Sequence, residues 1–153
     1  MDVEMRIRGL MMDPNTNMPI VVLKDVASDT VLPIWVGLFE AHAIYNEIEK
    51  FSAPRPTTHD LTKNLIFSMN GRLDRVVITE LKDDTFYAVL WLTQDGEPLT
   101  VDARPSDAIA LALRADCPIY VAEPVLAMAR LSAAGPPVVS EGEWIWPDPG
   151  LFR

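Results

Sequence analysis

Short apolar or alternating runs, joined by tight polar links, are the feature that most restricts how this chain can fold. Such runs are typical of β-strands. Three of the links, at residues 25–30, 82–84 and 94–97, have the length and polar composition of hairpin turns between antiparallel neighbours. We therefore expect strands at residues 3–8, 19–26, 30–36, 72–81, 85–92 and 98–103, with a short one at 118–121.

Helical segments separate these strands. The sequence predicts helices at residues 38–50, 58–69 and 105–115, and a shorter one at 124–131. Because hairpins dominate, we predict an α+β fold with a mixed, mainly antiparallel sheet and three to four helices, in preference to a doubly wound α/β sheet. A chain of 153 residues, 49% of them hydrophobic, is long enough to bury one globular core.

The junction between the last long strand and the helix at 105–115 is the first candidate site. Pro105 suits the first helical position, which makes Arg104 the N-cap residue and puts Asp107 at the third helical position. Arginine caps a helix poorly, so we infer that its guanidinium binds an anion at this helix N-terminus. The structural alternative is that Asp107 stabilises the helix start and that Arg104 pairs with Asp102 or Asp107.

The same layout occurs 67 residues earlier (position 40 against position 107), where Gly37 is a permitted N-cap and Glu40 takes the place of Asp107. Each pattern follows the third of three expected strands. We interpret the repeat as an internal duplication of a strand-strand-strand-helix unit, which would bring two similar helix N-termini into one molecule. Because few positions match, chance similarity is the alternative.

A third polar cluster opens the helix expected at 58–69. Thr57 as N-cap, with Asp60 three residues later, forms the pattern of an ordinary helix start. His59 lies in the first turn, where a protonated imidazole would oppose the helix dipole. We therefore favour a neutral imidazole that accepts a proton or binds a metal. A hydrogen-bonded structural histidine is the alternative.

Composition restricts the function further. The formal net charge of −9 argues against a broad electrostatic contact with nucleic acid, so any such chemistry is expected to be local. One cysteine excludes an internal disulfide framework, and we expect Cys117 to be a buried apolar residue rather than a nucleophile. The chain has no long apolar run and begins with an acidic, strand-like segment. We therefore expect a cytoplasmic protein without membrane contact.

Three blocks of motif residues follow one another along the chain. They are Leu32-Pro33-Ile34-Trp35-Val36-Gly37 with Glu40-Ala41, then Arg55-Pro56 with Thr58-His59-Asp60-Leu61, and then Val101-Asp102-Ala103-Arg104-Pro105-Ser106-Asp107-Ala108 with Pro118-Ile119-Tyr120-Val121. In this order they resemble the bifunctional nuclease family, across about residues 1–130. The resemblance implies an α+β fold, self-association and the degradation of both DNA and RNA. His42 and Thr62 depart from the residues expected in the family.

The chain is therefore divided into a bifunctional-nuclease-like domain, residues 1–131, and a C-terminal arm rich in proline and tryptophan, residues 132–153. The arm carries large apolar side chains, and its prolines disfavour a helix. We expect it to dock on its own domain or on a neighbouring subunit. Exposed sheet edges favour a homo-oligomer, most simply a dimer, with the arm in the interface or over the cleft.

We interpret the three polar clusters as a site that hydrolyses phosphodiester bonds of DNA and RNA with low sequence preference. Such hydrolysis needs a positioned nucleophile, a proton acceptor and positive charge near the phosphorus. A Mg²⁺ or Mn²⁺ ion is expected to assist, and no organic cofactor is expected. The assigned residues are catalytic His59, Asp60, Arg104, Ser106 and Asp107, substrate-binding Arg55 and Thr58, and metal-binding Glu40, Asp60 and Asp107.

Neighbouring helix starts are expected to form one electropositive cleft. The residues expected to converge there are Arg55, His59, Asp60, Arg104, Ser106 and Asp107. The expected substrate is single-stranded or loosely structured nucleic acid, since the net charge leaves few cations for a duplex. The alternative function is a non-catalytic regulatory module that binds an anion, a nucleotide or a protein at the same positions. Helix capping, worth about 0.5–1 kcal/mol for each acid, is the structural explanation of the carboxylates.

Overall fold

The computed structural model of the protein describes residues 1–131 and 143–146. The elements in chain order are β1 (Asp2–Met12), β2 (Pro19–Asp25), β3 (Val31–Trp35), α1 (Leu38–Ile48), α2 (Thr58–Ser68), β4 (Gly71–Lys82), β5 (Thr85–Gln94), β6 (Glu97–Ala103), α3 (Pro105–Ala115), β7 (Ile119–Ala122), α4 (Glu123–Leu131) and β8 (Glu143–Trp146). Within these ranges no helix is long and apolar enough to span a membrane.

The strands form one sheet in the order β3-β2-β1-β7-β4-β5-β6, with β8 also paired to β1. The pairings are antiparallel except between β4 and β7, which run parallel. The three hairpins predicted from the polar links are confirmed, because they join β2 to β3, β4 to β5 and β5 to β6. The fold is therefore the predicted α+β fold, with a mixed, mainly antiparallel sheet.

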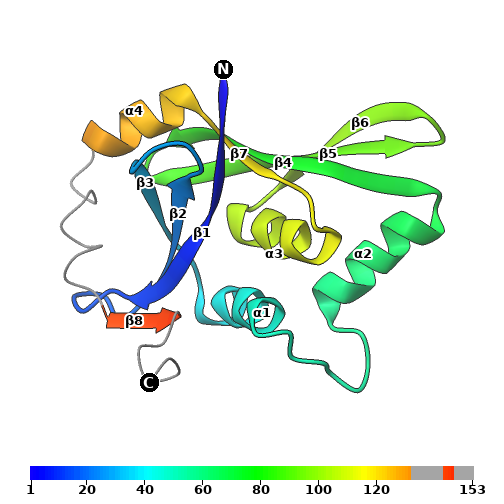
Figure 1. The fold of residues 1–153 in the computed structure, drawn as a ribbon, viewed down its shortest axis with the longest axis horizontal. Coiled ribbons are helices and arrows are strands. Elements are labelled where there is room, and N and C mark those ends of the chain that lie inside the picture. Colours follow the sequence, from blue (N-terminus) through cyan, green and yellow to red (C-terminus); the bar gives the residue numbers. More distant parts are fainter. Residues whose placement is uncertain (132–142, 147–153) are drawn as a thin grey trace.

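Two three-stranded meanders lie on either side of β7. The first is β1-β2-β3 and is followed by α1; the second is β4-β5-β6 and is followed by α3. A rotation of 180° about an axis perpendicular to the sheet relates the two meanders. It places β4 on β1, β5 on β2 and β6 on β3, with the strand directions matched. The strand-strand-strand-helix unit predicted from the sequence repeat thus occurs twice. Figure 1 shows α1, α2 and α3 on one side of the sheet and α4 on the other.

The core lies between the sheet and the helices, and the helices contribute to it unequally. Seven of the eleven residues of α3 are buried, among them Ile109 and Ala110. In α1 the buried residues are Ala41 and Ile44. In α2, all of which the structure describes, no residue is buried. Because α3 is fixed by the core and α2 lies at its rim, residues at the start of α2 can face the start of α3 across an open space.

Two local features differ from the sequence prediction. β1 extends to Met12 rather than ending at residue 8, and it is joined to β2 by a turn in which the amide of Asp13 donates to the Met18 carbonyl at 2.9 Å. The sequence did not predict this turn because it depends on contacts of the Asp13 side chain. The Asp13 carboxylate accepts hydrogen bonds from the nearby amide of Asn15 and from the indole of Trp35, 22 residues away. Such side-chain contacts hold a turn without glycine.

The second difference is β8, a strand formed by part of the C-terminal arm. Trp144 pairs with Met11 of β1, and the Arg8 guanidinium lies 5.3 Å from the centre of its ring. Ile145 packs against the main core. This part of the arm therefore docks on its own domain. Leu151 and Phe152 lie outside the described residues, and homo-oligomerisation stays a prediction.

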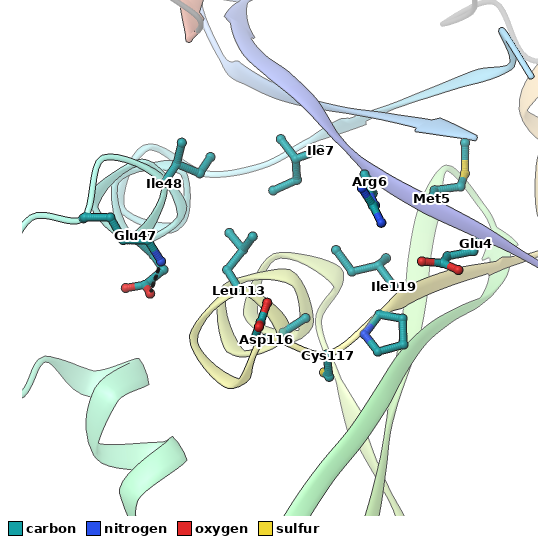
Figure 2. Close-up of a pocket in the computed structure, with 13 residues that line it drawn as sticks. Glu4, Met5, Arg6, Ile7, Glu47, Ile48, Leu113, Asp116, Cys117 and Ile119 are labelled. Carbon is teal, nitrogen blue, oxygen red and sulfur yellow. Dashed lines mark hydrogen bonds and ion pairs between the residues drawn. The ribbon is translucent and has the colours of Figure 1, made fainter. Parts of the chain in front are cut away.

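A hollow of about 750 Å³ opens between β1 and the C-terminal ends of α1 and α3 (Figure 2). Half-buried apolar side chains, including Ile7 and Leu113, surround it together with Cys117. Burial raises the pKa of the Cys117 thiol to about 11. The thiol is therefore protonated at neutral pH. Cys117 is half-buried at the edge of the core, so the prediction that it is buried was wrong.

Replacing Ile109 with alanine tests the central place of α3. The Ile109 side chain is fully buried, at 0% exposure. We expect the free energy of unfolding to fall by about 2–5 kcal/mol, because the variant loses apolar burial and keeps part of the cavity. Urea denaturation measures this quantity. Leu65→Ala, at a side chain of α2 that is 52% exposed, is the control and is expected to change stability by less than about 0.5 kcal/mol. Equal losses in the two variants would contradict the assignment.

Candidate active site

The first turns of α1 and α3 meet at one arginine. Arg104 is the N-cap of α3 and has extended backbone angles, with φ −70° and ψ 146°. Its Nε donates to Oδ2 of Asp107 at 2.8 Å, and its Nη2 donates to Oδ1 at 3.2 Å. Its Nη1 donates to Oε1 of Glu40 at 2.8 Å. One guanidinium therefore joins the third residues of the two helices that the sequence repeat related to each other.

Glu40 reaches this guanidinium because residue 37 has no side chain. Gly37 is the N-cap residue of α1. A Cβ atom at this position would overlap the carboxylate of Glu40. The glycine thus provides the space in which the Glu40 carboxylate turns back over the helix start toward Arg104.

His59 approaches the same aspartate from the first turn of α2. Its Nε2 lies 2.8 Å from Oδ1 of Asp107, although the two residues are 48 positions apart in the chain. The His59 side chain is 16% exposed, whereas that of Arg104 is 62% exposed. The imidazole is therefore the inner partner of Asp107, and the guanidinium is the outer one.

The protonation states follow from these contacts. Burial raises the pKa of Asp107, but the hydrogen bonds from Arg104 and His59 outweigh it and hold the pKa below the ordinary aspartate value. Hydrogen bonds to Asp107 and Glu40 raise the pKa of Arg104. An ionised carboxylate only accepts hydrogen bonds, so the Nε2 of His59 carries the donated proton. In the neutral ring, Nδ1 is then the nitrogen that can accept a proton.

A cleft of about 610 Å³ lies beside this cluster. Its lining comes from α1, from the start of α2, from the end of β6 and from α3. The predicted site residues that line it are Glu40, Thr58, His59, Arg104 and Asp107. The structure thus brings together candidates from all three polar clusters of the sequence.

Asp60 has a different environment. Its Oδ2 accepts hydrogen bonds from the backbone amide of Thr57 at 2.9 Å and from the Thr57 hydroxyl at 2.8 Å. Its Oδ1 accepts one from the Nε of Arg114 at 2.8 Å. The Thr57 amide, assisted by the other two donors, lowers the pKa of Asp60 to about 2. These contacts give Asp60 a structural role at the start of α2.

The expectation that six residues share one cleft is wrong for three of them. Arg55 and Asp60 line a neighbouring hollow of about 440 Å³. Ser106 is buried and lines a third hollow of about 280 Å³ near Trp35. Successive helical residues point about 100° apart. Ser106 and Asp60, each adjacent in sequence to a cleft residue, therefore face other directions.

Two residues that line the cleft, Arg114 and His42, were not among the site residues predicted from the sequence. Arg114 lines the cleft and is only 5% exposed; besides Asp60 it binds the carbonyls of Ala43 and Ala110, at 3.1 and 3.0 Å. Arg114 lies seven residues after Asp107, so both side chains are on one face of α3. This spacing could have identified Arg114 as a cleft residue from the sequence. His42 also lines the cleft. It lies on a face of α1 that is adjacent to the packed one.

The donors for a metal ion are few. Within residues 1–131 and 143–146, no group of three His, Cys, Asp or Glu side chains is arranged to hold a metal ion. Asp60 is occupied by Thr57 and Arg114. Glu40 and Asp107 lie on two sides of Arg104. Among the described residues the protein side chains therefore form no complete cage. The carboxylate residues that line the cleft are Glu40, Asp102 and Asp107, and Arg104 binds the first and the last of them.

Replacing Asp60 with asparagine tests its structural role. The folded-state pKa of about 2 is below the ordinary value of 3.8. The ionised form therefore stabilises the fold above about pH 4, and this contribution is lost as the pH falls toward 2. We expect Asp60→Asn to be less stable than the wild type at neutral pH, and the difference in unfolding free energy to shrink on acidification. Urea denaturation at several pH values measures it, with Asp29→Asn in the β2–β3 turn as control. Parallel pH curves for wild type and Asp60→Asn would contradict the assignment.

Comparison with known proteins places this geometry in a family. The bifunctional nuclease domain family matches residues 21–134. An uncharacterized protein of Mycobacterium tuberculosis is 43% identical over 128 residues, which cover 84% of this chain and 76% of that protein. Bifunctional nuclease 2 of rice (Oryza sativa subsp. japonica) is 35% identical over 107 residues, covering 67% of this chain and 33% of the rice protein. Bifunctional nuclease 1 of Arabidopsis thaliana is 30% identical over 107 residues, again covering 67% of this chain and 33% of that protein. Because the family match spans most of the chain and includes all three polar clusters, this protein belongs to the bifunctional nuclease domain family.

Proposed function

We propose that this protein is a nuclease that hydrolyses phosphodiester bonds of DNA and RNA with low sequence preference. The observation that carries the proposal is the Asp107 carboxylate, which binds both His59 and Arg104 beside an open cleft. A histidine that can accept a proton and an arginine that can bind phosphate are two of the groups that phosphodiester hydrolysis needs. Membership of the bifunctional nuclease domain family supports the same activity.

His59 is the proposed general base. Asp107 fixes the imidazole through Nε2 and determines its tautomer. It also stabilises the positive charge that the ring acquires when Nδ1 takes a proton. In the proposed reaction a water oxygen bonds to phosphorus while one of its protons passes to Nδ1 of His59. The ester P–O bond then breaks, and the leaving oxygen takes a proton from solvent.

Arg104 is the proposed phosphate ligand. A guanidinium has five N–H donors, and three of those on Arg104 are used by carboxylates in the described part of the chain. Two donors therefore remain for phosphate oxygens, on a side chain that is largely exposed. Glu40 and Asp107 hold the group in place, so little side-chain entropy is lost when phosphate binds.

Two further residues have proposed binding roles. Thr58 lines the cleft next to His59, and its hydroxyl is suited to a phosphate or sugar oxygen. Arg55 lies in the hollow on the other side of the start of α2. We propose that Arg55 binds a phosphate of the same strand farther from the reacting bond.

A divalent cation is a further proposal. Mg²⁺ is commonly held by one or two carboxylates together with substrate phosphates, rather than by a complete protein cage. Glu40 and Asp107 are both bound by Arg104, so a cation here would use only the remaining lone pairs of these carboxylates, together with a substrate phosphate and water. Bound there, Mg²⁺ or Mn²⁺ would supply additional positive charge near the phosphate.

Paired substitutions test the site. We expect His59→Gln, Arg104→Ala and Asp107→Asn each to lower the rate of oligonucleotide cleavage by about 10²-fold or more. The first variant removes the proton acceptor, the second removes the phosphate ligand, and the third weakens the contacts that hold both groups in place. The matched controls are Arg72→Ala and Asp74→Asn, which break another exposed Arg–Asp pair outside the cleft. All proteins are purified identically, so that a contaminating nuclease acts equally in every sample. Undiminished cleavage in the three site variants would reject the site, and retained binding without cleavage in the wild type would favour a binding module.

Chelation tests the cation. We expect cleavage by the wild-type protein to stop in excess EDTA and to return when Mg²⁺ or Mn²⁺ is added beyond the chelator, since the proposed cation is bound by only two carboxylates and substrate. The initial rate is measured at each step. A rate unchanged by exhaustive chelation would show that Arg104 and His59 act without a metal.

A further inference from the structure

One face of α1 lines the cleft opposite the start of α2. Phe39, His42 and Asn46 all line it, and their spacing of three and four residues is that of a single helical face. Phe39 immediately precedes Glu40, whose carboxylate binds Arg104. An aromatic ring therefore lies one residue from a group that holds the proposed phosphate ligand.

The exposure of Phe39 is not explained by packing. Its side chain is 87% exposed, the highest value for an aromatic residue among those that the structure describes. The residues through which α1 packs on the core are Ala41, Ile44, Tyr45 and Ile48. None of these four is among the residues that line the cleft. Other exposed phenylalanines, such as Phe67, occur on the protein surface. Phe39 differs from Phe67 because it lines the cleft beside Arg104, where its ring can contact a bound ligand.

The charges around the cleft leave little electrostatic attraction for a nucleic acid, so other contacts must contribute to its binding. Arg104 is balanced by Glu40 and Asp107, and Arg114 by Asp60. Few unpaired cations therefore remain to bind a polyanion, which agrees with the overall charge of −9. Stacking of nucleobases on aromatic rings supplies affinity without charge, at about 1–3 kcal/mol for each base.

We propose that Phe39 stacks on an unpaired base of a single-stranded DNA or RNA segment whose phosphate is bound by Arg104. The proposal rests on the proposed nuclease function and names its substrate class. A duplex keeps its internal bases stacked on one another, so an internal base cannot present a face to Phe39 without unstacking. Stacking tolerates every base because each has a π-face, and this would give a site with low sequence preference.

Binding measurements test the proposal separately from cleavage. The probe is a fluorescein-labelled 12-residue oligothymidylate, and affinity is measured by fluorescence anisotropy. The parent protein is His59→Gln, which lacks the proposed base while its side-chain amide can still donate to Asp107. Phe39→Ala and Phe39→Trp are introduced into this parent. The matched control is Phe67→Ala, at a phenylalanine of α2 that is 80% exposed and lies outside the cleft.

We expect Phe39→Ala to weaken binding of the single strand by about 5- to 100-fold, the loss of one stacking contact. Phe39→Trp should restore it, and Phe67→Ala should leave it unchanged. Affinity for a circular duplex, which has no terminal base pairs, should not depend on residue 39. Failure of the parent to bind the single strand, an equal effect of Phe39→Ala on strand and duplex, or an equal loss in Phe67→Ala would overturn the proposal. Full cleavage activity in the Arg104 and Asp107 variants would reject the nuclease site, yet a selective loss of binding in Phe39→Ala would still establish the stacking contact.

Discussion

Arg104 holds the first turns of α1 and α3 together because its guanidinium donates to Glu40 on one helix and to Asp107 on the other. Two carboxylates at adjacent helix starts would repel each other without a cation between them. Gly37 leaves room for this arrangement, since a Cβ atom there would force the end of the Glu40 side chain to shift. The position of His59 depends on it in turn, because Arg104 keeps Asp107 oriented toward the cleft. The core holds the helices in place, and the geometry of the site at their first turns depends on this one ion-paired side chain.

The three helices that begin at this region each carry an acid at the third position, and the N-cap residue decides what that acid does. Thr57 offers an amide and a hydroxyl, and Asp60 closes onto them. Gly37 offers only space, so Glu40 extends to a partner on another helix. Arg104 offers a guanidinium that draws Asp107 outward, where His59 can reach it. The same local pattern therefore yields one structural carboxylate and two that border the cleft.

The sequence was sufficient where structure is set locally. The three hairpin links and the bounds of α3 were predicted correctly because turn residues and Pro105 act on their own neighbours. Pairings between distant segments, such as β8 on β1, left no local signal. In the site, the types of His59, Arg104 and Asp107 pointed to the cleft. Asp60 instead binds the Thr57 amide and hydroxyl, which is the helix-start alternative that the sequence also offered, and Arg114, 54 residues away, adds a contact that left no local signal. Sequence position alone did not determine which of two adjacent polar residues faces the cleft.

β7 has a consequence for the order in which the molecule is completed. This strand of four residues pairs with β1 on one side and with β4 on the other, and it follows both meanders in the chain. During synthesis from the N-terminus, both meanders and all three helices that border the cleft emerge before the strand that joins the halves of the sheet. Residues 119–122 complete the sheet by joining the two meanders, whose helices α1 and α3 also contact each other through Arg104 and Glu40. The sheet beneath the cleft is therefore completed only after every element that lines the cleft has been synthesised, when β7 pairs with both meanders.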